Sequence, residues 1–211
     1  MDKRFWAIIG VIIAVFAGVL WFSGNEEKKE DEGKTTTSQA TNHVKGKTDS
    51  KVTLVEYGDF QCPYCAQYYP IVEQVTQKYN DKIKFQFRNY PLAQLHLNAV
   101  SAARAAEAAD MQGKYWDMYN KLYQTQSEWS ESNSARTTFE GYATELGLDL
   151  AKFKKDFGSS AANDRINADK REFNKLNLTK STPTFLLNGK KIQPTSVEEF
   201  SKLIDEALKK N

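Results

Sequence analysis

The sequence predicts an α/β fold in which a strand–helix–strand unit, a long helical block and a strand–strand–helix unit follow one another. Apolar runs with strand-like patterns flank a helical pattern early in the chain, and two short runs flank an Asn-Gly turn near its end. Between these units, helical spacing continues from about residue 92 to 177. Since two strands joined by a helix pair in parallel, the first unit predicts a parallel pair of strands.

The first unit begins with VTLVEY at 52–57. Its apolar side chains fall on both faces of an extended chain, which predicts a strand buried on both sides. Apolar residues at helical spacing predict a helix over 63–79. KIKFQF at 82–87 alternates strictly between apolar and polar residues, which predicts a second strand.

The helical block contains an alanine-rich stretch and an aromatic stripe. HLNAVSAARAAEAAD, at 96–110, favours a closely packed helix. The stripe in YWDMYNKLY, at 115–123, has the spacing of a helix-bundle core, and we interpret it so rather than as a ligand site. Gly147 predicts a helix end, and Asp149 predicts the N-cap of the next helix.

The last unit contains a hairpin and a capped helix. In PTFLLNGKKI, the Asn188-Gly189 pair between two apolar runs is the strongest short hairpin signal. Ser196 and Glu199 form a capping-box pattern at the start of the final helix.

The composition narrows the class of partner. The chain has 211 residues, enough for one or two domains, with 29 basic and 27 acidic side chains and a net charge of +2. This balance gives no reason to expect a nucleic acid as partner, because such proteins concentrate basic residues on one face.

The N-terminus predicts a membrane anchor. Residues 5–22 carry no charge and, as a helix, reach roughly 27 Å, close to the thickness of a bilayer core. A cleaved signal peptide is the alternative, but Trp21 or Phe22 would then stand where a small residue belongs. With Lys3 and Arg4 on the cytoplasmic side, we expect a single-pass membrane protein with an extracytoplasmic catalytic domain. This division gives an anchor segment at 1–23.

The stretch 24–50 contains almost no apolar residue, and we expect it to be a flexible tether. The folded domain is then expected at 51–211.

The only two cysteines, Cys62 and Cys65, lie in the CPYC sequence directly after the first strand. A structural disulfide would close only a four-residue loop and restrict the unfolded chain little. A zinc site would need further ligands, and His43 in the tether and His96 far along the chain are better interpreted as surface residues. Redox exchange is the third and favoured chemistry.

The CPYC sequence predicts two unequal thiols. Pro63 favours the first helical position, which makes Cys62 the N-cap. The helix dipole and the amides of Tyr64 and Cys65 then stabilise the Cys62 thiolate and lower its pKa. Cys65, one turn into the helix, is better shielded and suits the resolving role. A CxxC that opens a helix after a strand is typical of thioredoxin-like proteins.

VEYGDFQCPYCAQYYP and STPTFLLNG resemble the thioredoxin superfamily, and the helical block between them resembles the DsbA-like thiol:disulfide oxidoreductases of the membrane-tethered BdbD type. The resemblance covers roughly 50–210 and implies a thioredoxin fold with a helical domain inserted at about 92–177. It implies that Cys62 is the nucleophile, that Cys65 is the resolving cysteine, and that Thr182 and Pro183 form a cis-proline loop facing them.

The resemblance also implies roles for two further positions. Glu56, six residues before Cys62, corresponds to a buried acidic residue that handles protons for the resolving cysteine; the alternative is a structural glutamate. Pro70 resembles the helix-kinking proline of the superfamily. The Pro63-Tyr64 pair departs from the Pro-His pair of strongly oxidising members, so we expect a less extreme thiolate and a less oxidising potential.

The expected function is the introduction of disulfides into exported proteins by the Cys62–Cys65 pair, with no cofactor other than that redox-active disulfide. The resemblance implies exported cysteine-containing substrates and re-oxidation by a DsbB-like or VKOR-like membrane protein. Two alternatives remain: a tethered reductase or isomerase of the same fold, and a non-enzymatic chaperone-like binding module.

Overall fold

A five-stranded mixed sheet organises residues 40–210, the part of the chain that the computed structural model describes. Its order is β1-β3-β2-β4-β5, and only β2 and β3 are parallel. The strands are β1 (His43–Gly46), β2 (Thr53–Gly58), β3 (Lys84–Asn89), β4 (Thr184–Leu187) and β5 (Lys190–Ile192). The expected α/β fold is confirmed, and the second predicted strand begins two residues later than its apolar pattern.

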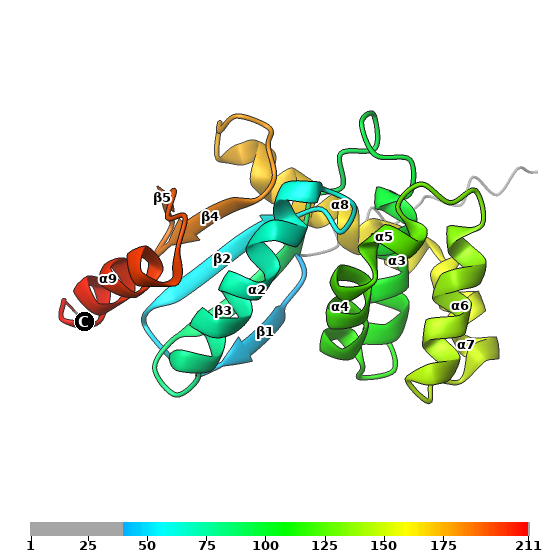
Figure 1. Cartoon of the computed structure of the whole chain (residues 1–211), viewed down its shortest axis with the longest axis horizontal. Coiled ribbons are helices and arrows are strands. Elements are labelled where there is room, and N and C mark those ends of the chain that lie inside the picture. The colour runs from blue at the N-terminus through cyan, green and yellow to red at the C-terminus, as the bar shows by residue number, and fades with distance from the viewer. Residues whose placement is uncertain (1–39, 211) are drawn as a thin grey trace, which may run out of the picture. The chain divides into compact units, whose positions relative to one another are not determined.

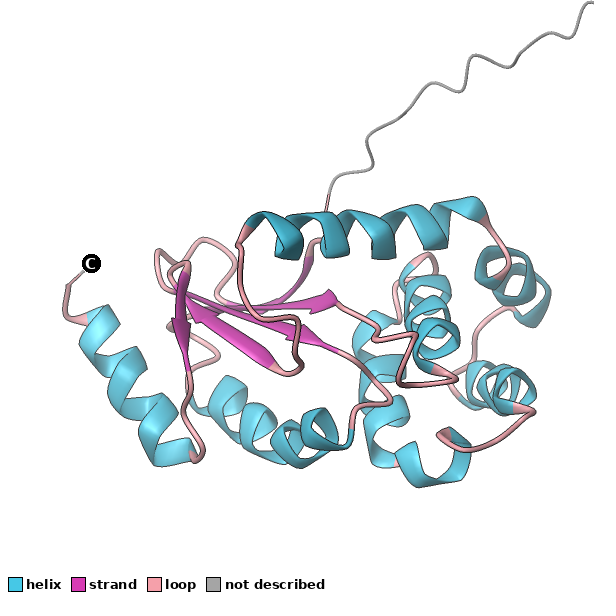
Figure 2. Cartoon of the chain, turned by 90° about the horizontal axis from the view of Figure 1, so that it is seen from above, coloured by secondary structure: helices cyan, strands magenta, loops and turns pink. Residues whose placement is uncertain are grey.

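Helices cover both faces of the sheet. α2 (Pro63–Lys78) and α9 (Val197–Leu208) lie on one face, and α8 (Ser160–Lys175) crosses the other (Figures 1 and 2). One row of side chains crosses all five strands on the α2 face, because the register aligns them: His43, Phe87, Glu56, Phe185 and Ile192. Glu56 is therefore flanked by two phenylalanines in the middle of an apolar layer.

The helical block predicted between the two halves is present. It contains α3 (Ala99–Asp110), α4 (Tyr115–Gln124), α5 (Gln126–Trp129), α6 (Ala135–Glu145) and α7 (Leu150–Phe157) before α8. The aromatic stripe of α4 is buried in the main core with the small side chains of α3, as its spacing predicts. Helices α3 to α7 gather beyond one edge of the sheet (Figure 1).

The local sequence signals form the predicted structures. Asp149 caps α7 by accepting a hydrogen bond from the Lys152 amide, and Gly147 takes a positive φ after α6. Asn188 and Gly189 both have positive φ angles in the tight turn between β4 and β5. These structures form where predicted because they depend only on neighbouring residues.

The cap of α9 differs in one detail. Ser196 accepts a hydrogen bond from the Glu199 amide, as the capping box predicts. The Glu199 carboxylate reaches one residue further back than in a standard capping box and accepts from the amide and hydroxyl of Thr195.

The predicted tether is wrong at its C-terminal end, because residues 43–46 form β1 and pair with β3. His43 is also wrongly predicted as a surface residue. It is 5% exposed, lies 2.7 Å from a Glu107 carboxylate oxygen, contacts Asp110 and stacks on Tyr115 with ring centroids 3.5 Å apart. Burial of polar side chains with partners on distant helices leaves no apolar pattern in the sequence.

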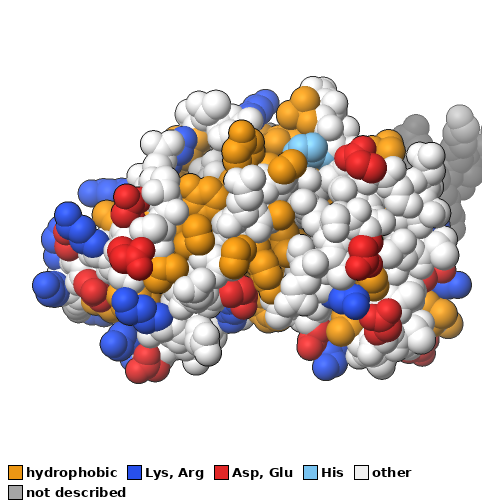
Figure 3. Space-filling view, in the orientation of Figure 1, with side chains coloured by type: hydrophobic (Ala, Val, Ile, Leu, Met, Phe, Trp, Pro, Cys, Tyr) orange, Lys and Arg blue, Asp and Glu red, His pale blue; other side chains and the backbone are white. Residues whose placement is uncertain are grey.

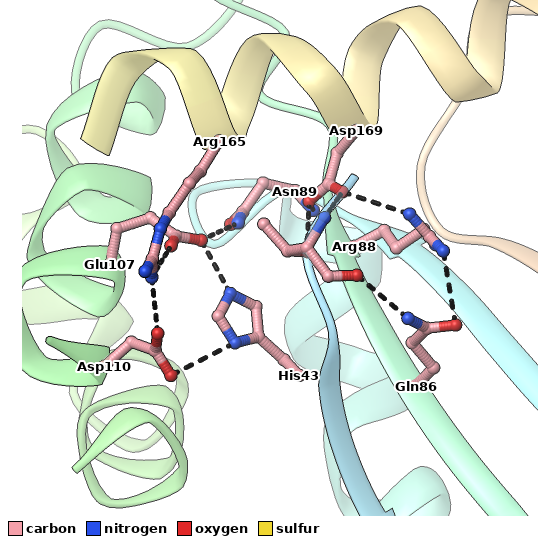
Figure 4. A network of polar contacts seen from close by, with 9 residues as sticks. His43, Gln86, Arg88, Asn89, Glu107, Asp110, Arg165 and Asp169 are labelled. Atoms are coloured by element: carbon pink, nitrogen blue, oxygen red, sulfur yellow. Dashed lines mark hydrogen bonds and ion pairs between the residues drawn. The ribbon is translucent and has the colours of Figure 1, made fainter. Parts of the chain in front are cut away.

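His43 belongs to a buried polar network that joins the sheet to the helical block (Figure 4). Arg165 of α8 pairs with Glu107 and Asp110 of α3, and the Asn89 amide group also donates to Glu107. Asp169 of α8 receives hydrogen bonds from Thr41 and from the Asn89 backbone amide and pairs with Arg88. The network fixes β1 and β3 against α3 and α8.

The predicted membrane anchor at 5–22 lies outside the described residues. Within residues 40–210, no helix has both the length and the apolar character needed to cross a membrane.

Candidate active site

Cys62 and Cys65 lie at the start of α2, where the chain turns out of β2. Cys62 is the N-cap with an extended backbone, and Pro63 occupies the first helical turn, as predicted. The Cys62 carbonyl accepts the first helical hydrogen bond, from the Ala66 amide at 3.1 Å. Both cysteines are free thiols.

The two thiols have opposite acidities. The pKa of Cys62 is lowered to about 6, first by a hydrogen bond from the Cys65 thiol and then by the nearby Thr182 side chain and the amides of Cys65 and Tyr64. Burial opposes this shift. Burial raises the pKa of Cys65 well above its usual value, and the neighbouring Cys62 and Glu56 raise it further. The predicted inequality of the thiols is present, with Cys65 itself as the largest stabiliser of the Cys62 thiolate.

Glu56 lies on β2 beneath the two cysteines and is 1% exposed. Burial raises its pKa to about 8, while the charge of Lys45 opposes the shift. One of its carboxylate oxygens, Oε2, has no hydrogen-bond partner among the described residues. A carboxyl group with this pKa can exchange a proton near neutral pH, which fits the expected chemistry of Glu56.

The Thr182–Pro183 peptide bond is cis, and the loop that contains it faces Cys62. The Cys62 thiol donates a hydrogen bond to the Thr182 carbonyl oxygen, with sulfur and oxygen 3.4 Å apart. A molecule bonded to the Cys62 sulfur must therefore lie against this loop.

Asp59 and its contact with His96 were not predicted from the sequence. The Asp59 amide lies 3.5 Å from the Cys65 sulfur, and its carboxylate accepts hydrogen bonds from the amides of Gln61 and Leu92. His96 Nδ1 lies 2.7 Å from an Asp59 oxygen, so His96, although partly exposed, also supports the site. Asp59 follows a strand and a glycine, which is the signal that could have identified it.

Hydrogen bonds of two glutamines, which the sequence did not predict, connect the active-site turn to the helical block. Gln126 donates to the carbonyls of Phe60 and Cys62, at 2.7 and 3.1 Å. Gln61 donates to the Ser130 carbonyl and accepts from the Asn98 amide. These contacts span more than 30 residues of sequence, and no local pattern predicts them.

Within residues 40–210, no group of three or more His, Cys, Asp or Glu side chains is placed to hold a metal ion. The arrangement around Cys62 is suited to thiol–disulfide exchange. It combines a stabilised thiolate, a shielded partner thiol, a proton-exchanging carboxyl group and a loop against the reactive sulfur.

Comparison with known proteins agrees with this fold. The sequence model of the family described as Thioredoxin matches residues 38–206. A thioredoxin-like oxidoreductase from Silicibacter pomeroyi has 27% identity and a TM-score of 0.66, over 79% of this chain and 91% of that one. BdbD from Bacillus subtilis, in its oxidised form, has 24% identity and a TM-score of 0.70, over 82% of this chain and 100% of that one. Wolbachia pipientis α-DsbA1 has 19% identity and also a TM-score of 0.70, over 82% and 94% of the two chains.

Curated relatives include much longer proteins. The Na(+)/H(+) antiporter NhaA 1 of Mycolicibacterium gilvum is 36% identical over 151 residues, which are 71% of this chain and 24% of that protein. The chain thus spans about a quarter of the length of such relatives.

Proposed function

The chain belongs to the thioredoxin family, and from this premise we propose that it is an extracytoplasmic thiol:disulfide oxidoreductase that introduces disulfides into exported proteins. The observation that carries the proposal is the opposite shift of the two thiol pKa values at one helix start. A stable Cys62 thiolate favours the reduced form of the pair, and an enzyme with a favoured reduced form gives up its disulfide readily.

The catalytic cycle starts from the Cys62–Cys65 disulfide. A substrate thiolate attacks the Cys62 sulfur, the bond to Cys65 breaks, and a mixed disulfide between substrate and Cys62 forms. Cys65 leaves as a thiolate and takes up a proton. A second substrate thiolate then attacks the substrate sulfur of the mixed disulfide, so that the substrate leaves oxidised and Cys62 leaves as a thiolate.

We infer that Glu56 exchanges the proton of Cys65. Its pKa of about 8 lets it hold or release a proton near neutral pH, and its charge raises the pKa of the neighbouring Cys65. A protonated Glu56 supplies the leaving Cys65 thiolate with its proton, and the ionised form removes that proton when the disulfide forms again.

Location and re-oxidation are parts of the same proposal. We propose that residues 5–22 anchor the chain in the membrane and that a DsbB-like or VKOR-like membrane protein removes the two electrons from the reduced pair. The support is the uncharged run behind Lys3 and Arg4, together with the stability of disulfides outside the cytoplasm.

A direct test uses the oxidised full chain and a reduced peptide with two cysteines. Mass spectrometry measures disulfide formation in the peptide. Oxidation of the peptide should require a stoichiometric amount of enzyme and should not occur with Cys62→Ser. Cys65→Ser cannot form the enzyme disulfide and should also be inactive as an oxidant. A peptide that stays reduced in the presence of oxidised wild-type enzyme would contradict the proposed direction and favour the reductase alternative.

A further inference from the structure

Two hollows lie on either side of the loop that faces Cys62. The first, of about 210 Å³, is lined by residues that include Tyr64, Pro183 and Lys191. The second, of about 570 Å³, is lined by residues that include Leu92, Leu95, Lys170 and Lys180. We call them the β5 hollow and the α8 hollow.

The two hollows are close to each other and to the reactive sulfur. Ser181 lines the β5 hollow and its chain neighbour Lys180 lines the α8 hollow. Thr182, the next residue, has its carbonyl oxygen 3.4 Å from the Cys62 sulfur. A peptide bonded to Cys62 therefore lies against residues 181–183, and its flanking residues reach one hollow or both.

The charge in both hollows is of one sign. Three lysines contribute to their lining, Lys170, Lys180 and Lys191, and no aspartate or glutamate does. No ion pair is formed by any of these three lysines within residues 40–210. Some surface lysines have carboxylate partners, as in the pair of Lys175 with Glu172 at 2.7 Å, and others do not. The three lysines are distinguished by their place in hollows near Cys62 that no acidic side chain lines.

Exposed apolar side chains accompany the hollows. Tyr64 in the β5 hollow and Leu95 in the α8 hollow are 65% and 75% exposed, which is unusual for large hydrophobic side chains. On the face drawn in Figure 3, hydrophobic side chains gather in the middle and charged side chains lie mainly toward the two ends. Apolar contacts can hold a peptide there without choosing its sequence, whereas unpaired lysines distinguish its charge.

We propose that this face selects cysteine-containing segments with aspartate or glutamate side chains within a few residues of the reactive cysteine, and that Lys180 and Lys191 determine this preference. The inference rests on the proposed exchange at Cys62 and adds a substrate class to it. A carboxylate in either hollow pairs with a lysine that otherwise has no acidic partner, while a lysine in the peptide is repelled.

The test uses three peptides that share one cysteine and differ only in two flanking residues: aspartate, serine or lysine. Each cysteine is activated as a mixed disulfide with 2-nitro-5-thiobenzoate. In the full-length Cys65→Ser chain, the Cys62 thiolate attacks the peptide sulfur and breaks its bond to thiobenzoate. The Cys62–peptide disulfide forms, and the released thiobenzoate anion is measured by its absorbance.

The aspartate peptide should react about tenfold faster than the lysine peptide at low ionic strength. Two partly screened ion pairs between peptide aspartates and the lysines of the hollows are together strong enough for a tenfold change in rate. High salt should bring the ratio close to one. Rates are divided by those of each peptide with free dithiothreitol, which removes differences in intrinsic reactivity.

Charge reversal identifies the residues responsible. Lys180→Glu/Lys191→Glu should invert the order of the peptides. The matched control Lys190→Glu/Lys209→Glu makes the same change in net charge outside both hollows and should keep the original order. Equal normalised rates in the parent chain, or the same inversion in both double variants, would overturn the proposal.

The serine peptide separates this proposal from the proposed function. If it reacts at Cys62 and all three peptides react equally, exchange stands and only the charge preference fails. If no peptide forms a mixed disulfide with Cys62, the proposed function itself fails.

Discussion

At the scale of single residues, the chemistry of Cys62 depends most on its partner thiol. The rate of alkylation by iodoacetamide should rise with pH around a midpoint near 6, because the pKa of Cys62 is lowered to about 6. Cys65→Ala should move the midpoint toward the ordinary cysteine value, since it removes the largest stabilising hydrogen bond. Cys65→Ser, which keeps a donor, should move it less. A midpoint near 9 in the wild-type chain would contradict the account.

The buried site destabilises the charged form of Glu56, whereas it stabilises the charged form of Cys62. An ionised Glu56 therefore opposes folding. Its pKa is about 8 in the folded chain and about 4.5 when unfolded, so the folded state holds the extra proton between these values. Stability therefore falls as pH rises through this window. Glu56→Gln should be more stable than the wild type at pH 8, by on the order of 4 kcal/mol, and about equal to it at pH 4.

Urea unfolding at both pH values measures this difference, with the cysteines kept reduced. The same substitution should slow the release of Cys65 during exchange, because the amide cannot donate or accept the proton in place of the carboxyl group. A variant of unchanged stability at pH 8 would show that Glu56 is not held in an unfavourable charged state.

At the scale of elements, the end of β2 allows no side chain at Gly58. A Cβ atom there would lie 2.4 and 2.6 Å from two ring atoms of Phe87, whose side chain is fully buried. Gly58→Ala should cost about 2–4 kcal/mol in urea unfolding, as overpacking of a core does. Gly141→Ala, in α6 with open space around it, is the matched control and should be neutral or slightly stabilising. Equal losses in the two variants would contradict the packing argument.

The β1 strand depends on His43, whose pKa is raised to about 9. Burial opposes this shift, and the carboxylates of Asp110 and Glu107 produce it. The charged imidazole stabilises the fold fully below its unfolded pKa of about 6.5, and this contribution is lost as pH rises through 9. Between pH 7 and 10, the wild type should lose on the order of 3 kcal/mol more stability than His43→Asn.

The change in stability with pH must be compared between the wild type and His43→Asn, because tyrosines, lysines and cysteines also titrate in this range. The same pH dependence in both would contradict the role assigned to His43. Hydrogen exchange of the β1 amides should increase in His43→Asn before that of β2, since β1 is the strand that His43 holds in place.

At the scale of the whole molecule, the sequence predicted what local patterns determine. The helical block, the hairpin at Asn188-Gly189, the α7 cap and the position of Cys62 as N-cap all follow from residues near one another. β1 was missed because its four residues include only one apolar side chain, Val44, and form a strand only through pairing with β3 and contact with α3. Asp59 and Gln126 were missed because their roles depend on contacts with residues distant in the sequence.

We propose above all that the Cys62–Cys65 pair donates its disulfide to substrates. The most direct test is the equilibrium redox potential of the full chain against glutathione, followed through tryptophan fluorescence. The low pKa of Cys62 predicts a potential of about −150 mV or higher, with the reduced form more stable to heat than the oxidised form. A potential below about −220 mV, with the oxidised form more stable, would contradict the claim and assign the chain to disulfide reduction or isomerisation.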